Sequence, residues 1–333
     1  MVPHIRPILW LVVILFATVF EAFAQQSGER GIQLYLEGKL DAAIAVLETS
    51  TKEKGNSKNA GVWNILGLAY YAKDDMKGAK RAFETAVRID PNLAAYHGNL
   101  ATVLLAIGKL RDARSESDKT LRLDPKNTNA LYILGRLSLW EGKLEDAEQN
   151  ALRILALAPE SPDGYILRSN VLMARLGKFV GSGWDVKDEL ELLKEAADVL
   201  NIGAKKSQKH PDNSFIVDQA ESVSAFYDYF AKDRTMAGSK APTDDVRPLK
   251  ITKKSPASYT SRARSAGVQG TIRMAVLFGA NGRVKYALLL RGLGYGLDEA
   301  AAQAARSIEF IPQTVAGKPV SVVKMVEYTF SIF

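Results

Sequence analysis

The chain has 333 residues, of which 47% are hydrophobic and 24% charged, so its composition is that of a globular protein of about two domains and excludes a disordered or fibrous one. It has no cysteine, which excludes disulfides, thiolate metal sites and a cysteine nucleophile, and its three histidines leave little material for metal or acid–base chemistry. The net charge of +7 is uneven, because residues 25–246 carry 30 basic and 32 acidic side chains whereas residues 247–333 carry 13 basic and 4 acidic ones.

The first segment is typical of an export signal. An apolar run, Ile8–Phe20, follows Arg6 and is 13 residues long, which is shorter than the roughly 20 apolar residues that a spanning helix needs. Ala22-Phe23-Ala24 then places small residues where a signal peptidase reads. We expect residues 1–24 to be a signal peptide, removed after Ala24, and the mature chain to lie outside the cytoplasm. Retention of the apolar run as an inner-membrane anchor is the alternative.

A repeat of 34 residues fills the next part of the chain. Its most complete copy has the spacing W-x2-L-G-x2-Y, A-x3-F-x2-A and P, at Trp63, Leu66, Gly67, Tyr70, Ala79, Phe83, Ala86 and Pro91. Pro125 and Pro159 continue the period, and Gly-Lys-Leu recurs at 38–40, 108–110 and 142–144. This is the tetratricopeptide pattern. It predicts pairs of antiparallel helices, held closely together at small residues, which stack because one pair cannot bury its apolar face alone.

The predicted helical solenoid covers residues 25–232, with divergent amphipathic helices after Pro159. Such a solenoid has a concave groove lined by the first helix of each pair. The groove candidates, all polar or aromatic, are Asn64, Tyr71, Tyr132, Arg136 and Asn170. They indicate either a binding surface for an envelope protein or an ordinary solvated face.

Residues 233–248 are polar, contain Gly, Ser and two prolines, and have no periodicity, so we expect a flexible linker. Beyond it the apolar period changes from 3.6 to 2. Asn281-Gly282 is a hairpin signal between two alternating segments, in the second of which Val284, Tyr286, Leu288 and Leu290 should share one face. A short helix that Asp298 can cap precedes a last strand over 320–332.

The predicted fold class is therefore an all-α solenoid followed by a small α+β domain over residues 249–333. The order of elements in that domain is helix, strand, strand, helix, strand. It predicts a three-stranded antiparallel sheet with helices on one face.

The C-terminal segment resembles the C-terminal domain of the TonB family of Gram-negative energy transducers. The residues that carry the resemblance are Pro256, Tyr259, Ala263, Arg264, Gly267, Gly270, Asn281, Gly282, Val284, Leu297, Asp298, Ala300, Ala301, Phe310, Pro312, Gly317, Pro319 and Val320. They occur in the family's order over about 80 residues. Thr260 stands where the family usually has proline, and a repeat solenoid occupies the place of the family's proline-rich spacer.

The resemblance implies a binding mode and a partner. In the family, a short extended segment of an outer-membrane receptor, the TonB box, adds a strand to the exposed edge of the sheet. The last strand is the candidate edge here, and the side chains that should face one way along it are those of Val322, Lys324, Val326, Tyr328 and Phe330. Lys324 can protect this edge from aggregation or steer an acidic peptide. A central or self-paired strand without a ligand is the alternative.

The sequence predicts an interaction protein of the periplasm without cofactor or metal. Only His97 and His210 remain outside the leader, so no catalytic set can be named, and we expect no enzyme. The basic C-terminal domain favours an acidic protein or an anionic membrane surface, and export argues against nucleic acid. Two other functions stay open: an envelope scaffold without a transport role, or an energy transducer driven by the ExbB–ExbD motor if residues 8–20 stay as an anchor.

Overall fold

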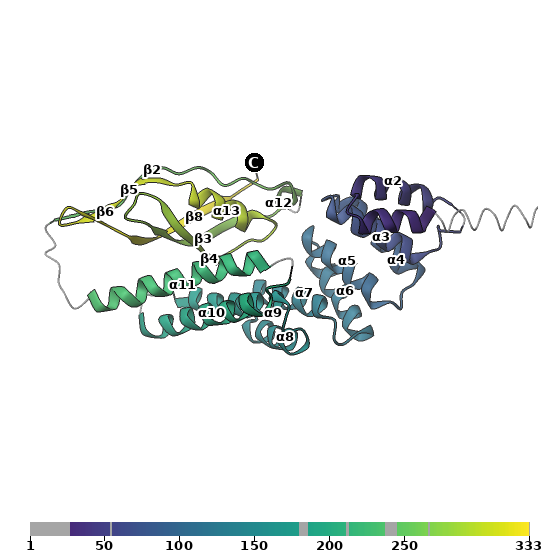
Figure 1. Cartoon of the computed structure of the whole chain (residues 1–333), viewed down its shortest axis with the longest axis horizontal. Helices are drawn as coiled ribbons and strands as arrows, with labels where there is room; N and C mark the ends of the chain where they lie inside the picture. Colours follow the sequence, from purple (N-terminus) through teal and green to yellow (C-terminus); the bar gives the residue numbers. More distant parts are fainter. Residues whose placement is uncertain are drawn as a thin grey trace, which may run out of the picture. The chain divides into compact units, whose positions relative to one another are not determined.

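The computed structural model describes residues 27–53, 55–179, 186–210, 213–236, 245–265 and 267–332. The predicted signal peptide, residues 1–24, lies outside this part of the chain. The chain forms two compact units that divide between Ala130 and Leu131 (Figure 1). Each unit is described by itself below.

The first unit is all-α and consists of paired helices. A helix over residues 27–36 is followed by α2 (Leu40–Ser50), α3 (Ala60–Ala72), α4 (Met76–Ile89), α5 (Ala94–Ala106) and α6 (Leu110–Leu123). Helix α7 (Thr128–Trp140) begins in this unit and continues into the second. The predicted tetratricopeptide pairs are therefore present as α3 with α4 and α5 with α6.

Local sequence explains where these helices begin and how closely they approach. The Asp75 carboxylate accepts the backbone N–H of Gly78 at 2.9 Å and so caps α4. The small residues Ala79 and Ala113 are completely buried where the two helices of a pair meet. Gly67 on α3 leaves room for the Phe83 ring, because a Cβ at this position would lie 2.6 Å from that ring. The motif residues therefore mark the tightest helix contacts.

The second unit joins helices to a sheet. Its helices are the rest of α7, α8 (Leu144–Leu157), α9 (Pro162–Phe179), α10 (Val186–Lys206), α11 (Asn213–Met236), α12 (Ser261–Ser265) and α13 (Leu297–Arg306). Its strands are β1 (Val246–Arg247), β2 (Lys250–Lys253), β3 (Gly270–Phe278), β4 (Val284–Arg291), β5 (Glu309–Ile311), β6 (Gln313–Val315), β7 (Lys318–Val320) and β8 (Val322–Phe330).

The main sheet is antiparallel and three-stranded, as predicted, with the order β4-β3-β8. Two small sheets accompany it, one with the order β1-β6-β7 and one formed by β2 and β5. Strand β3 pairs with β8 without interruption from Gly270↔Phe330 to Phe278↔Val322. The predicted last strand is divided in two, because β7 pairs with β6 before β8 begins.

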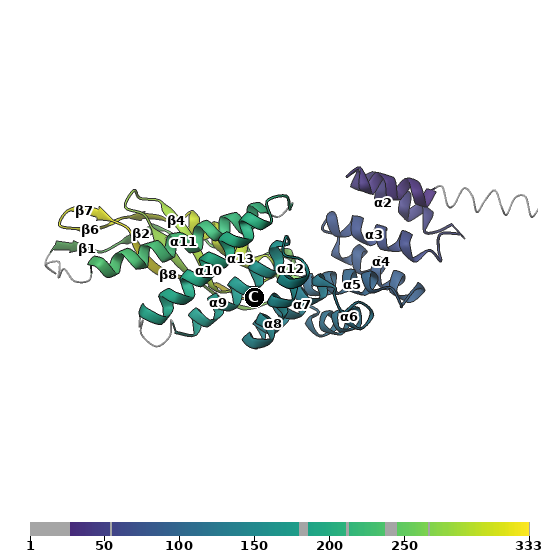
Figure 2. The same cartoon turned by 60° about the horizontal axis from the view of Figure 1, so that its bottom comes forward.

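The prediction of helices on one face of the sheet was wrong, because both faces are covered. On one face, α13 packs over a core that includes Val276, Phe278 and Val326. On the other face, Leu277 and Leu288 are buried in a cluster with residues of α9, α10 and α11. Figures 1 and 2 show α10 and α11 along this second face. Burial on both faces explains why β3 is apolar at consecutive positions and does not alternate.

The predicted common face of Val284, Tyr286, Leu288 and Leu290 was wrong at its first member. Tyr286, Leu288 and Leu290 pack toward α9–α11, whereas Val284 packs in the cluster beneath α13. The cause is a register shift, since Leu277 pairs with Tyr286 but Phe278 pairs with Val284. An extra residue in one strand moves the following side chains to the opposite face.

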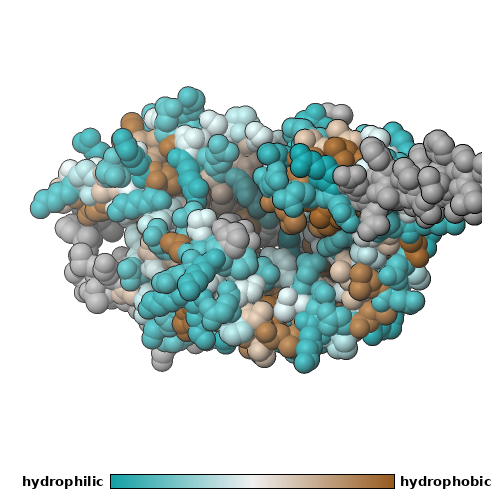
Figure 3. Space-filling view, turned by 45° about the vertical axis from the view of Figure 1, so that its right-hand side comes forward, coloured by the Kyte–Doolittle hydropathy of each residue, from teal (hydrophilic) through white to brown (hydrophobic). Residues whose placement is uncertain are grey.

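The segment predicted as a linker, residues 233–248, has structure at both ends. Helix α11 continues to Met236, and Val246 and Arg247 pair with β6 as strand β1. Residues 237–244, between these elements, lie outside the described part of the chain. Hydrophilic residues cover most of the face drawn in Figure 3, and its apolar residues are scattered in small groups, which is normal for a protein surface.

Candidate functional site: the outer edge of strand β8

Strand β8 lies at an edge of the main sheet. Its nine residues pair in register with β3, and no other strand of the described residues pairs with it. The opposite edge, β4, has two register shifts against β3 and also lies against α9, α11 and α13. A regular edge offers a row of N–H and C=O groups to an added strand, and an irregular one does so less well. The outer edge of β8 is therefore the better site for strand addition.

The side chains of β8 alternate as the sequence predicted. Val326, Tyr328 and Phe330 are buried in the cluster beneath α13, and Val322 packs against it. Lys324 belongs to the same face but is exposed. On this face of β8, the second half of the strand is thus apolar and buried, whereas Lys324 in the first half is exposed to solvent.

One contact indicates which backbone groups of β8 point outward. The Lys254 ammonium donates a hydrogen bond of 2.7 Å to the carbonyl oxygen of Glu327. Since β3 occupies the inner side, this bond indicates that the Glu327 carbonyl points away from the sheet. In an antiparallel strand the N–H and C=O of one residue point the same way and alternate along the chain. The outward-facing groups therefore belong to Val323, Met325, Glu327 and Thr329.

Side chains across β3 and β8 agree with this register. The Arg273 guanidinium donates to the Glu327 carboxylate at 2.7 Å, and the hydroxyls of Thr271 and Thr329 lie 3.1 Å apart. Close side-chain contacts of this kind are typical of the pairs that do not exchange backbone hydrogen bonds. The backbone groups of Glu327 and Thr329 are then free of β3 and face the open edge.

Tyr328 lies beneath the Lys254 contact. The Lys254 ammonium is 4.6 Å from the centre of the Tyr328 ring, which is a cation–π distance. Burial raises the pKa of the Tyr328 phenol. Its hydroxyl is buried and has no hydrogen-bond partner among the described residues. Lys254 is thus held at the edge by two contacts, neither of which sequence reasoning predicted.

The residues that carry the family resemblance form the core and turns of this domain. The Tyr259 hydroxyl donates to the Val268 carbonyl, and its ring meets Phe330 edge-on at 5.7 Å. The Arg264 guanidinium lies 5.5 Å from the centre of the Tyr259 ring. Leu297 is completely buried, and Phe310 packs edge-on against Phe278 at 4.8 Å. The other motif residues are Pro256, Gly267, Gly270, Asp298 and Pro312, of which Gly267 and Gly270 have positive φ.

Asp298 does not cap α13 as predicted. The cap position is Gly296, and the Asp298 carboxylate instead accepts the backbone N–H groups of Leu293 at 2.8 Å and Gly294 at 3.1 Å. The pKa of Asp298 is raised overall, chiefly by burial, although these two hydrogen bonds lower it. The carboxylate lies in the first turn of the helix and ties the preceding glycine-rich loop to it.

This loop meets helix α7 of the repeats. The ring of Tyr295 is stacked on Trp140, with ring centres 6.3 Å apart and planes 10° from parallel. The Arg136 guanidinium lies 5.2 Å from the Trp140 ring and 5.8 Å from the Tyr132 ring. Of the predicted groove residues, Arg136 therefore lies against Trp140, which contacts the C-terminal domain, and Tyr132 lies beside Arg136. The sequence did not predict that Arg136 would lie against Trp140.

The remaining groove candidates lie on other helices. In the first unit, the Asn64 amide oxygen accepts a hydrogen bond of 2.8 Å from Asn99, and Tyr71 is 36% exposed. In the second unit, Asn170 on α9 is exposed. These positions are accessible or half-buried, and their role as a binding surface remains a prediction.

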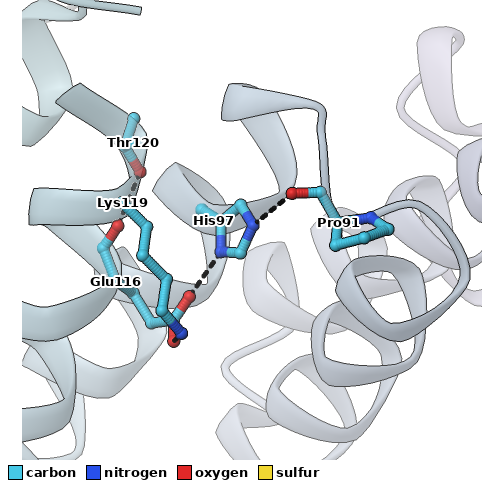
Figure 4. A network of polar contacts seen from close by, with 5 residues as sticks. All are labelled: Pro91, His97, Glu116, Lys119 and Thr120. Atoms are coloured by element: carbon cyan, nitrogen blue, oxygen red, sulfur yellow. Dashed lines mark hydrogen bonds and ion pairs between the residues drawn. The ribbon is translucent and has the colours of Figure 1, made fainter. Parts of the chain in front are cut away.

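A buried polar network holds α5 to α6 in the first unit (Figure 4). His97 is 4% exposed, and its two ring nitrogens face the Glu116 carboxylate at 2.6 Å and the Pro91 carbonyl at 2.9 Å. The ring therefore lies within hydrogen-bonding distance of a carboxylate on α6 and of a carbonyl just before α5. Burial raises the pKa of Glu116, but hydrogen bonds from His97 and Lys119 outweigh it and lower that pKa overall. The network therefore joins α5 to α6 through a buried polar contact.

Comparisons with known families agree with both parts of the chain. Residues 255–332 match the family described as Gram-negative bacterial TonB protein C-terminal. Residues 60–93 and 99–162 match tetratricopeptide repeat families. The chain thus contains tetratricopeptide repeats followed by a C-terminal domain of the TonB family, both of which are protein-interaction domains. The TonB domain indicates a protein of the Gram-negative envelope.

Individual relatives match parts of the chain. The chain is 32% identical over 82 residues to DnaJ homolog subfamily C member 7 of Mus musculus and 30% identical to that of Homo sapiens, and spans 17% of each. Among solved structures it is similar to MamA, with a TM-score of 0.44, 19% identity and coverage of 54% of this chain and 96% of MamA. The thermophilic TPR protein TTC0263 of Thermus thermophilus gives a TM-score of 0.45, 19% identity and coverage of 59% and 98%.

Within the described residues, no helix combines the length and the apolar character that crossing a membrane requires. The apolar run Ile8–Phe20 lies outside these residues.

Proposed function

We propose that this protein works in the periplasm, where its C-terminal domain docks on TonB-dependent outer-membrane receptors and assists transport. The receptor's TonB box, a short extended segment, would add a strand to the outer edge of β8. The repeat solenoid would hold a second envelope protein. The observation that carries this proposal is the nine-residue edge strand, which pairs in register with β3 and with no second strand of the described residues.

Backbone hydrogen bonds would supply the affinity, through the outward groups of Val323 and Met325. Side chains that alternate across the new pair would supply specificity. Lys324 is exposed beside these groups, and residues 247–333 carry 13 basic against 4 acidic side chains. These charges favour a segment with an acidic side chain, and the attraction should weaken with added salt.

A cysteine cross-link tests this proposal in cells. The chain has no cysteine, so Met325→Cys introduces a unique thiol on the edge strand, to which a photo-activated cross-linker can be attached. Lys285→Cys, on the exposed part of β4, is the matched control. We expect the Met325 variant, but not the Lys285 variant, to be linked to a TonB-dependent receptor, and deletion of the protein to slow that receptor's uptake.

Other results would support the alternatives. Equal linking from both positions, or linking to no receptor, would contradict docking at β8. Unchanged uptake with a weakened envelope would favour a scaffold without a transport role. An intact mass that retains residues 1–24, in an inner-membrane fraction, would favour an anchored transducer that works with ExbB–ExbD.

A further inference from the structure

The open edge of β8 is not uniform along its length. Its first half, with outward groups on Val323 and Met325, has no described backbone or side-chain partner on the outer side. At Glu327 the outward carbonyl is already bonded to the Lys254 ammonium at 2.7 Å. Beyond it, Tyr259 lies against Phe330. A strand that pairs along β8 therefore meets an occupied position after Met325.

The Lys254 side chain is held in this position by more than one contact. Strand β2 places the preceding residue, Lys253, in a cross-strand ion pair of 3.0 Å with Glu309. The chain then leaves β2, and the Lys254 ammonium reaches both the Glu327 carbonyl and the face of the Tyr328 ring, at 4.6 Å. A cation that satisfies a backbone carbonyl at an edge blocks the hydrogen bond that an added strand would make there.

We propose that Lys254 determines the length of the strand that β8 accepts, by closing the edge at Glu327. This inference rests on the proposed strand addition at β8 and concerns the specificity of that site. An incoming segment would pair with Val323 and Met325 and stop. A segment that continues past Met325 could not use the Glu327 carbonyl, because Lys254 already holds this acceptor.

The test compares two synthetic peptides on the full chain by fluorescence anisotropy. Both probes alternate valine and threonine and end in one glutamate. The short one, of about five residues, reaches only Val323 and Met325, and the long one, of about nine residues, continues past Glu327. The variants are Lys254→Met, which keeps an apolar stem over Tyr328, and Lys254→Gln, which keeps a polar group. The matched control is Lys253→Met, which removes the same charge next in sequence but leaves the Glu327 carbonyl bonded.

We expect the wild type and Lys253→Met to bind the two peptides equally. Lys254→Met and Lys254→Gln should bind the long peptide roughly threefold to tenfold more tightly than the short one, since the freed carbonyl gains a hydrogen-bond partner. The inference is overturned if the wild type already prefers the long peptide, or if the Lys254 variants show no such preference. Binding of neither peptide to any variant would refute strand addition itself, which separates that failure from the failure of the role of Lys254.

Discussion

The packing of the sheet against α9–α11 makes a strong prediction about stability. Leu277 is 4% exposed on β3 and faces the cluster formed with these helices. Leu277→Ala removes three carbon atoms, whose transfer free energy is about 0.8 kcal/mol each. The cavity left behind adds a further cost, so that buried Leu→Ala changes range over about 2.7–5.0 kcal/mol. We expect a loss of about 3 kcal/mol in the free energy of unfolding.

The assay must show where the loss occurs. Hydrogen exchange of the full chain measures the protection of each helix. Denaturant unfolding, followed by circular dichroism, measures the overall free energy of unfolding. Ile272→Ala is the matched control, because Ile272 is completely buried on the same strand but faces the cluster beneath α13. Leu277→Ala should lower the protection of α10 and α11 amides, whereas Ile272→Ala should affect α13 first. Unchanged protection of α10 and α11 in Leu277→Ala, with a stability loss below about 1 kcal/mol, would refute the packing argument.

Three further predictions concern other parts of the chain. Gly67→Ala should cost about 1–3 kcal/mol in thermal or urea unfolding, since its Cβ would overlap the Phe83 ring, and a neutral result would contradict the close contact of α3 and α4. Tyr328→Phe removes a buried hydroxyl without a described partner, so its free energy of unfolding should stay equal or rise by up to about 1 kcal/mol, and a fall would reveal a missed partner. Because the pKa of Glu116 is lowered in the fold, its contribution to stability is complete above its ordinary value of 4.5 and is lost as the pH falls through the lowered pKa. Unfolding measured against pH should therefore show a shallower acid-side decline in Glu116→Gln than in the wild type, and parallel curves would contradict the role of the network with His97.

The helical repeats could be predicted closely because their pattern is local. Proline, glycine and small residues recur at fixed spacing, and each acts within one turn or one helix pair. Gly108 and Gly142 adopt positive φ at the turns between paired helices, and Asp74 takes the same conformation one period earlier. The repeat therefore specifies a conformation at this position, which Gly adopts without strain and Asp tolerates.

The second face of the sheet could not be predicted from the alternation of residues alone. The run Met274-Ala275-Val276-Leu277-Phe278 is apolar at every position, which signals burial on both sides. The run does not indicate which elements cover the second face, because those elements, α9–α11, lie far from β3 in the sequence. The register shift between Leu277 and Phe278 depends on how β3 and β4 pair, so it could not be predicted from either strand alone.

At the β8 edge, the sequence predicted the strand and its two faces but not Lys254. The partner of Lys254 is a backbone carbonyl 73 residues away. A carbonyl has no sequence signature, so neither composition nor spacing could indicate this bond. Lys324, which the sequence predicted as a site residue, is exposed near the start of the strand, and its role in binding stays a prediction.

Strand addition at β8 is tested most directly by removing one outward N–H group. The contact of Lys254 with the Glu327 carbonyl indicates that the Met325 N–H, two residues earlier, also faces the open side, so Met325→Pro should delete this donor and leave the hydrogen bonds to β3 intact. Met325→Ala keeps the donor and is the control. Binding of the short valine–threonine peptide to the full chain should fall by about tenfold or more in Met325→Pro and stay unchanged in Met325→Ala, with circular dichroism spectra equal in both. Undiminished binding by Met325→Pro would contradict docking at this edge.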